Sequence, residues 1–375
     1  MIYLDYSANT PVDARVLEQF CAVERRCIGN ANSHHQAGSA AKAEIDAATI
    51  KIASLLGVQP AEIIYTSGAS EANNFALKGL ARLSRHAGRH IISTPLEHSS
   101  VSGTLTALQE QGYEIDLLDV KQDGTVDLEH LKDLLRPDTI CVAVTLVDSE
   151  LGVVQPVQEI AAILKTYPHC HLHVDATQAV GKIPVSFEGV DTMSLTAHKF
   201  YGLNGIGLLI KRRNLALEPL IHGGESTTIY RSGTPTVALA SSLACALDLA
   251  VTDLSGRVDH VAKLNAELRA ALSTYPLVRI NSPDHAIPHV LNLSVRNVKG
   301  TVFQRELDAK GVCVSVKSAC SSDGLPSRAV FAVSRDRRNA LSSWRISLSH
   351  LTTEDEIKAF LQAFDVCCRE LTALH

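Results

Sequence analysis

The chain has 375 residues, of which 46% are hydrophobic and 20% are charged, and its formal net charge is −5. This composition indicates a globular protein with a large buried core, and the length favours two or three domains over one. The weak negative charge excludes a general attraction to nucleic acid or to an anionic membrane, so neither is expected as a direct partner. No apolar stretch reaches the roughly 18 to 20 residues that span a bilayer, and a cytoplasmic location is expected.

The nine cysteines indicate neither a disulfide framework nor a metal centre. Their number is odd, no Cys-x-x-Cys spacing occurs, and Cys141, Cys245 and Cys313 lie within apolar stretches where thiols pack as small hydrophobic groups. We therefore expect a reducing compartment and no bound metal. The adjacent Cys367 and Cys368 fall in a helical pattern, which favours a structural role.

Short apolar runs alternate with longer helix-period segments from about residue 13 to 255, a pattern typical of a parallel α/β architecture. The expected strands are Glu62–Thr66, His90–Ser93, Ile140–Val144, His171–Asp175 and Gly205–Ile210. We therefore expect an α/β fold with a large, mostly parallel sheet domain over residues 13–255.

The pattern changes after about residue 256. A long helix is expected over Val258–Leu272, a strand within Ala286–Val295 and a helix over Gly300–Lys310. Thr352 or Thr353, followed by acidic residues, is typical of the start of a final helix. Residues 256–375, joined by residues 1–12, are expected to form a smaller α+β domain.

Two successive expected strands end close to groups that suit one cofactor. Asp175 ends one apolar run. Lys199 lies 24 residues later and follows the next apolar run along the chain. Ligand sites in such sheets lie outside the carboxyl ends of the strands. A carboxylate held against a pyridine nitrogen and a lysine that reacts with an aldehyde are what pyridoxal phosphate needs from a protein. The sequence therefore predicts an enzyme that uses pyridoxal 5'-phosphate.

Two further polar segments follow strand ends. The stretch from Thr66 to Asn74 leads into a helix, so its N–H groups and the Ser70 hydroxyl are candidates to hold a phosphate; a simple helix-capping turn is the alternative. His98 follows the next strand, where it would stack on the cofactor ring or move protons, or else serve only as a polar residue at a helix N-terminus.

Ordered motifs along nearly the whole chain carry a family resemblance. They include Tyr3-Leu4-Asp5-Tyr6, Ser67-Gly68-Ala69-Ser70-Glu71, Glu97-His98, Asp175-Ala176-Thr177-Gln178, Ala197-His198-Lys199, Arg231-Ser232-Gly233-Thr234, Ser318-Ala319-Cys320 and Trp344-Arg345-Ile346-Ser347. Together they resemble the group I cysteine desulfurases of the class V aminotransferase superfamily. The resemblance implies a fold-type I, pyridoxal-phosphate-dependent transferase whose large domain binds the cofactor and whose small domain carries the catalytic cysteine loop.

The resemblance also implies roles for individual residues. Lys199 would be the Schiff-base lysine and the shuttle of the α-proton, Asp175 would face the pyridine nitrogen, Gln178 would donate a hydrogen bond to the ring oxygen, and His98 would stack on the ring. The phosphate ligands implied are Ala69, Ser70, Thr196 and His198, with Thr234 from a second subunit of a homodimer. Arg345, as a two-pronged fork, and Asn32 would bind the substrate.

The resemblance assigns the nucleophile to Cys320, which would take sulfur from L-cysteine and become a persulfide. A thiolate is required for this attack, and an unperturbed thiol is only slightly ionised near neutral pH. Lys317 and Arg328 are candidate sources of local positive potential; for Lys317 the alternative is a solvated loop charge.

Three features depart from the family pattern. Asp148-Ser149 stands where two asparagines are usual, so the hydrogen bond to the ring oxygen would come from Ser149 or be lost. Lys317 replaces a glycine, and the segment between Cys320 and Arg345 is shorter by about two residues. These differences leave the sulfur-acceptor protein open, in iron–sulfur cluster assembly, tRNA thiolation or DNA sulfur modification.

We interpret the chain as a homodimeric cysteine desulfurase that forms L-alanine and passes sulfur to an acceptor protein. The nearest alternatives are a related pyridoxal-phosphate lyase acting on selenocysteine, cysteine sulfinate or cystine, and an aminotransferase. A weakly catalytic sulfur-transfer scaffold is an alternative of another class.

Overall fold

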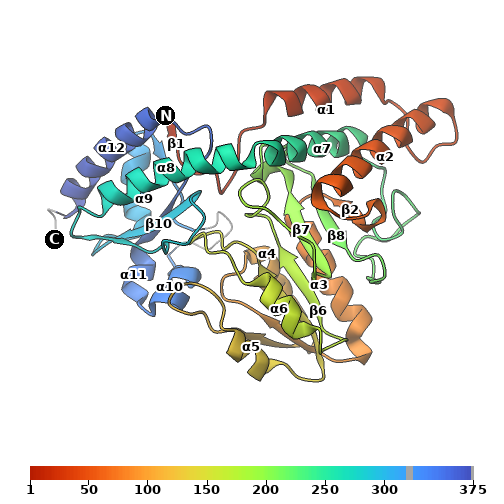
Figure 1. The fold of residues 1–375 in the computed structure, drawn as a ribbon, viewed down its shortest axis with the longest axis horizontal. Helices are drawn as coiled ribbons and strands as arrows, with labels where there is room; N and C mark the ends of the chain where they lie inside the picture. Colours follow the sequence, from red (N-terminus) through yellow and green to blue (C-terminus); the bar gives the residue numbers. More distant parts are fainter. Residues whose placement is uncertain (318–323, 373–375) are drawn as a thin grey trace.

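The computed structural model describes residues 1–317 and 324–372, whose fold is shown in Figure 1. Its main feature is a seven-stranded sheet with the order β2-β8-β7-β6-β5-β3-β4. The strands are β2 Ile63–Thr66, β3 His90–Ser93, β4 Glu114–Leu117, β5 Thr139–Thr145, β6 His171–Asp175, β7 Thr192–Thr196 and β8 Gly207–Lys211. All are parallel except β8, which runs antiparallel to both neighbours. Residues 197–206, between β7 and β8, are too few for the crossover of about a dozen residues that a parallel return needs.

Helices cover both faces of this sheet. One face packs against α3 (Ala69–Leu83) and α4 (Ser99–Gln109). The other packs against α2 (Gln36–Leu56), α5 (Leu128–Leu134), α6 (Val157–Leu164) and α7 (Val237–Thr252). Strand β5 is buried throughout, with Cys141 and Ala143 facing one layer and Val142 and Val144 the other. Burial on both faces explains why its sequence is a continuous apolar run.

Helix α1 (Ala14–Arg26) and α2 pack against α7 at one edge of the large sheet. In Figure 1 both extend outward beyond the sheet, in red and orange. Their shared contact is a small apolar cluster that contains Val23, Ala41, Ile45 and Ala238.

A second group of elements surrounds a three-stranded antiparallel sheet in the order β12-β10-β9. These strands are β9 Val278–Ile280, β10 Val290–Val295 and β12 Ser343–Ser347. The helices are α8 Leu254–Leu272, α9 Gly300–Ala309, α10 Arg328–Ser334, α11 Arg337–Ser342 and α12 Glu354–Thr372. Phe303 stacks on Trp344 in its core, with ring centroids 5.1 Å apart. Cys367 and Cys368 are buried in the same core, which confirms their expected structural role.

The two chain termini lie at the same end of the molecule (Figure 1). Strand β1 (Ile2–Tyr3) pairs in parallel with β11 (Val312–Cys313), and Asp5 forms a bridge with Ser347 of β12. The first residues therefore pack with the C-terminal elements, and from there the chain runs toward the large sheet.

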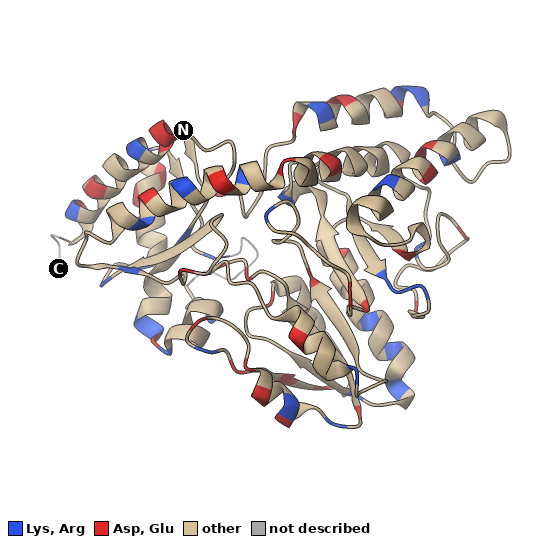
Figure 2. Ribbon diagram, viewed as in Figure 1, with Lys and Arg blue, Asp and Glu red and all other residues tan. Residues whose placement is uncertain are grey.

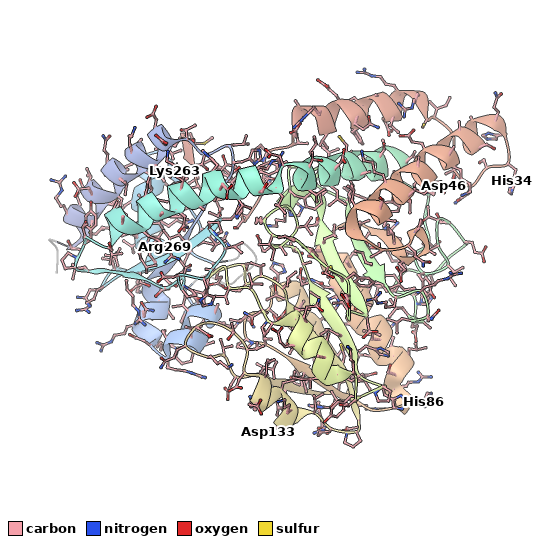
Figure 3. All side chains as sticks on the ribbon, viewed as in Figure 1. His34, Asp46, His86, Asp133, Lys263 and Arg269 are labelled. Atoms are coloured by element: carbon pink, nitrogen blue, oxygen red, sulfur yellow. The ribbon has the colours of Figure 1, made fainter. Side chains whose placement is uncertain are left out.

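Charged residues of both signs occur along the outer helices (Figure 2). Lys263 of α8, labelled in Figure 3, forms an ion pair with Glu354 at the start of α12. Within residues 1–317 and 324–372 no single helix is long and apolar enough to cross a membrane; α7 and α8 pass that test only as a pair bent by 65°.

Candidate active site

A cavity of about 320 Å³ lies at the carboxyl ends of the strands of the large sheet. It brings together ten of the residues proposed from the sequence: Ala69, Ser70, His98, Ser149, Asp175, Gln178, Thr196, His198, Lys199 and Arg345. Ser7 and Ala8 also line it, although no site role was assigned to them from the sequence. The cavity therefore combines residues from both groups of elements.

The turn between β2 and α3 leaves a helix N-terminus open to the cavity. Gly68 is the N-cap residue and no side chain caps the helix, while the Glu71 carboxylate accepts from the N–H of Ser67 at 2.7 Å. A Cβ at Gly207 of β8 would lie 2.7 Å from the Gly68 Cα, so glycine is required where β8 passes this turn. The uncapped N–H groups at the positive end of α3 suit a phosphate.

Asp175, at the end of β6, is buried and held by two donors. The Asn73 amide donates to Oδ2 at 2.8 Å, and the Thr177 N–H donates to Oδ1 at 2.9 Å. Asn73 is itself fully buried; it also donates to Ser100 Oγ at 2.9 Å and has its oxygen 3.0 Å from His173 Nε2. Asn73 lies in the motif that resembles the family, yet no role was assigned to it from sequence, because a contact 102 residues away leaves no local signal.

Lys199 follows β7 in a short 3₁₀ turn and points at the N-terminal segment. Its Nζ donates to the carbonyl oxygens of Ser7 at 2.7 Å and Ala8 at 2.5 Å. Beside it, His198 Nδ1 lies 3.1 Å from Thr196 Oγ1. Burial, and then the positive charges of Lys199 and Lys182, lower the pKa of His198 to about 4, so its ring is neutral.

His98 caps the N-terminus of α4 and also lines the cavity. Its Nδ1 accepts from the Ser100 N–H at 3.1 Å, so the proton of the neutral ring belongs on Nε2. Burial lowers the pKa of His98, although the charge of Asp175 acts in the opposite direction. Both roles considered from the sequence, helix capping and contact with a bound ring, are compatible with this position.

Arg345 of β12 is a buried guanidinium that retains donors for a ligand. Nη2 donates to Asp5 Oδ1 at 3.0 Å and Nη1 donates to the Ser149 carbonyl oxygen at 2.7 Å. Within the described residues Nε has no hydrogen-bond partner. Because arginine carries five N–H donors, the group can still bind a carboxylate in two-pronged fashion.

The Asp148-Ser149-Glu150 segment places two acidic groups behind the cavity. Burial, and then Glu150, raise the pKa of Asp148 to about 7; its Oδ1 has no partner in the described part of the chain. Glu150 accepts from Ser327 Oγ at 2.6 Å, and burial raises its pKa as well. Lys317 donates to the Leu325 carbonyl oxygen at 3.1 Å.

Three residues that were proposed from the sequence are not among the described residues that line this cavity in one chain. Asn32 lines a separate cavity of about 610 Å³, with its amide 3.4 Å from Ser226 Oγ. Thr234 is exposed in the loop that leads to α7. Cys320 lies outside the described residues.

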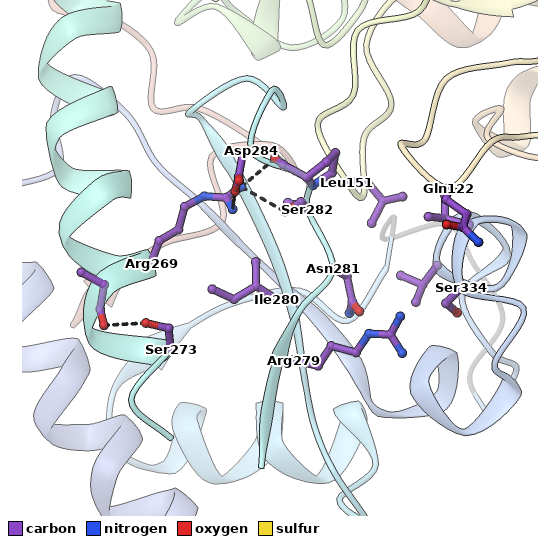
Figure 4. A pocket seen from close by; sticks show the side chains of 14 residues that line it. Gln122, Leu151, Arg269, Ser273, Arg279, Ile280, Asn281, Ser282, Asp284 and Ser334 are labelled. Atoms are coloured by element: carbon purple, nitrogen blue, oxygen red, sulfur yellow. Dashed lines mark hydrogen bonds and ion pairs between the residues drawn. The ribbon is translucent and has the colours of Figure 1, made fainter. Parts of the chain in front are cut away.

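Another cavity, of about 670 Å³, lies away from these residues (Figure 4). There the Arg269 guanidinium of α8 donates hydrogen bonds to two neighbouring residues. Nη1 lies 3.1 Å from Asp284 Oδ1, and Nη2 lies 2.9 Å from the Pro283 carbonyl oxygen. Its guanidinium is thus used in holding the loop before β10.

The residues of the 320 Å³ cavity fit pyridoxal phosphate. An open helix N-terminus suits the phosphate, the buried Asp175 suits the pyridine nitrogen, and Lys199 supplies an amine for the aldehyde. These matches come from observed contacts and burial.

Comparisons with known proteins agree with this geometry. The model of the aminotransferase class-V family matches residues 2–360. A cysteine desulfurase IscS of Proteus mirabilis is 40% identical over 365 residues, covering 95% of this chain and 90% of its own length. The cysteine desulfurase IscS of Dictyoglomus turgidum is 35% identical over 378 residues, covering 100% and 96%.

Solved structures show the same similarity. A structure described as a NIFS-like protein has a TM-score of 0.92 and 35% identity, with 100% of both chains covered. Another, described as SspA in complex with cysteine, has a TM-score of 0.83 and 30% identity, covering 94% of this chain and 100% of its own. The chain therefore belongs to the class V aminotransferase family and, within it, to the pyridoxal-phosphate-dependent cysteine desulfurases.

Proposed function

We propose that the chain takes sulfur from L-cysteine, releases L-alanine and keeps the sulfur on Cys320 as a persulfide. The observation that carries this proposal is the meeting of four groups in one cavity: the Lys199 amine, the buried Asp175 carboxylate, the uncapped end of α3 and the Arg345 fork. The first three serve the cofactor, and the fourth suits the carboxylate of an amino-acid substrate.

Each of these groups has a distinct task in the proposal. The N–H groups of Ala69 and Ser70 hold the phosphate, with Thr196 and His198 beside them. Asp175 keeps a proton on the pyridine nitrogen, and Asn73 fixes the orientation of its carboxylate. When bound, the cofactor supplies an electron sink for charge that develops at the substrate α-carbon.

Lys199 would transfer a proton of the substrate, and His98 would shield the substrate. Lys199 takes the α-proton, and its amine is already directed into the cavity by the carbonyl groups of Ser7 and Ala8. The His98 ring is neutral and lines the cavity. Its Nδ1 accepts the hydrogen bond that caps α4. Ser149 lines the same cavity, and its hydroxyl would donate to the ring oxygen of a bound cofactor.

The sulfur-transfer step balances without any added oxidant. The Cys320 thiolate attacks the substrate sulfur, so a sulfur–sulfur bond forms and the carbon–sulfur bond of the substrate breaks. The electron pair of the broken bond stays with the carbon, which takes a proton. L-Alanine leaves, and one sulfur remains on Cys320 for a sulfur-acceptor protein.

We further propose that the working unit is a homodimer in the cytoplasm. Thr234 and Asn32 lie outside the cavity of their own chain, and both are exposed, so a second copy is the natural recipient of their side chains. Relatives that are called IscS support an acceptor in iron–sulfur cluster assembly. An acceptor in tRNA thiolation or in DNA sulfur modification stays an alternative.

The test is to compare wild type with Lys199→Ala after incubation with pyridoxal phosphate. Wild type should show a visible absorption band and form L-alanine from L-cysteine, and the variant should lose both. A variant that keeps the band and multiple turnovers would refute the assignment of Lys199. Wild type that cleaves selenocysteine or cysteine sulfinate but not cysteine would favour the related lyase, and wild type without a band would favour the scaffold.

A further inference from the structure

Lys182 is a buried lysine close to the cavity, and the function described so far does not use it. It lies in the turn after β6, seven residues beyond Asp175, and only 6% of its surface is exposed. No ion pair to Lys182 occurs within residues 1–317 and 324–372. Burial, and then the charges of Lys199 and Arg345, lower its pKa to about 7. An ammonium in this place is costly, so a purely structural role would be better served by a neutral side chain.

The only hydrogen bond of the Lys182 side chain within the described residues goes to Gln178. Nζ donates to Gln178 Oε1 at 3.0 Å. At the other end of the same amide, Gln178 Nε2 donates to the Ser7 carbonyl oxygen at 2.9 Å. That carbonyl oxygen also accepts from Lys199 Nζ. A chain of hydrogen bonds thus leads from Lys182 through Gln178 and Ser7 to Lys199.

The chemistry of these neighbours allows one orientation of the Gln178 amide. An ammonium only donates and a carbonyl oxygen only accepts. Turning the amide over would set its NH₂ against Lys182 and its oxygen against the oxygen of Ser7. In the observed orientation one N–H of Nε2 is used by Ser7, and the second remains for the cavity, which Gln178 lines.

We propose that Lys182 is a positioning residue that holds the Gln178 amide with an N–H directed at the bound cofactor. The inference rests on the proposed contact between Gln178 and pyridoxal phosphate. Without Lys182, the buried oxygen of Gln178 has no donor, and the side chain gains by moving to find one. Lys182 would therefore act on the cofactor through Gln178 and not through its own contact.

A double-mutant cycle on pyridoxal phosphate binding tests this inference. The dissociation constant and the absorption maximum of the bound cofactor would be measured for wild type, Lys182→Met, Gln178→Leu and the double variant. The measurement belongs at about pH 6, where a group with a pKa of about 7 is mostly protonated. Each single change should weaken binding about tenfold and shift the absorption band, and Lys182→Met should add less than a further twofold to Gln178→Leu.

Lys211→Met is the matched control, because Lys211 is also buried and donates to backbone carbonyl oxygens, including that of Leu215 at 2.7 Å, but does not line this cavity. It should lower the melting temperature without moving the absorption band. Fully additive effects of Lys182→Met and Gln178→Leu, or a wild-type dissociation constant and band for Lys182→Met alone, would overturn the inference. If Gln178→Leu itself changes neither the dissociation constant nor the absorption band, the proposed contact between Gln178 and the cofactor is wrong, and the inference about Lys182 falls with it.

Discussion

Asn73→Ala should be among the most destabilising single changes near the cavity. Asn73 is fully buried in α3, and its amide joins four side chains from strands β6 and β7 of the large sheet and from α4. It donates to Asp175 and Ser100, and its oxygen lies near His173 and Ser194. Alanine removes all four contacts and leaves the partner groups buried.

The size of the effect follows from these contacts. The hydrogen bond to the Asp175 carboxylate is of the charged kind and contributes about 1.5 to 3 kcal/mol, and each of the three bonds to neutral groups contributes about 0.5 to 1.5 kcal/mol. Burial lowers the pKa of His173 to about 4, so His173 counts among the neutral groups. The expected loss in the free energy of unfolding is therefore about 3 to 7.5 kcal/mol.

Urea denaturation of the cofactor-free protein, followed by circular dichroism, would measure this loss. Asn74→Ala is the matched control, because the neighbouring Asn74 makes one exposed hydrogen bond, to the Ser70 carbonyl oxygen at 2.9 Å. The control should cost less than about 1 kcal/mol. If Asn73→Ala costs no more than Asn74→Ala, the hydrogen-bond network that we assign to Asp175 contributes nothing to stability.

Three further changes have defined outcomes. Because the pKa of Asp148 is raised to about 7 from the roughly 3.9 of an exposed aspartate, the folded state holds this proton more tightly than the unfolded state. The resulting stability is complete below about pH 4, decreases as the pH rises from about 4 to 7 and is lost above about pH 7, so the melting temperature of wild type relative to that of Asp148→Asn should fall between about pH 4 and 7 and level off above; a difference that does not change with pH would contradict this. Arg345→Lys should raise KM for L-cysteine at least about tenfold, because an ammonium lacks the two-pronged geometry, and an unchanged KM would count against the carboxylate role. Gly207→Ala should weaken binding of pyridoxal phosphate, since the new Cβ would lie 2.7 Å from the Cα of Gly68 in the turn before α3, and wild-type affinity in a titration would show that the turn tolerates a side chain there.

The parts of the fold set by local pattern were predictable from sequence. His90–Ser93 and His171–Asp175 were expected with the bounds that the structure has, because burial on both faces gives continuous apolar runs. The strand expected within Ala286–Val295 begins only at Val290, since Pro288 cannot donate to a ladder. The antiparallel direction of β8 was not foreseen, because direction depends on the length of the connection and leaves no periodic signal.

The candidate site was predictable where a residue follows a strand end or carries a family motif. Asp175 and Lys199 met both conditions, and the structure brings them to one cavity. Asn73, Asp5 and Lys182 were missed as site residues, because their importance comes from single contacts between distant segments. The roles expected for Asn32 and Thr234 depend on a second copy, which one chain does not contain.

The central claim is that one sulfur atom passes from L-cysteine to Cys320. Mass analysis of the wild-type protein after brief exposure to L-cysteine, followed by peptide mapping, measures this transfer. We expect a gain of about 32 Da on the peptide that contains Cys320, and almost no L-alanine from Cys320→Ser. The buried Cys367, whose pKa burial raises to about 11, should stay unmodified. Added sulfur on Cys313 or on the Cys367-Cys368 pair, or L-alanine from Cys320→Ser at the wild-type rate, would contradict the account.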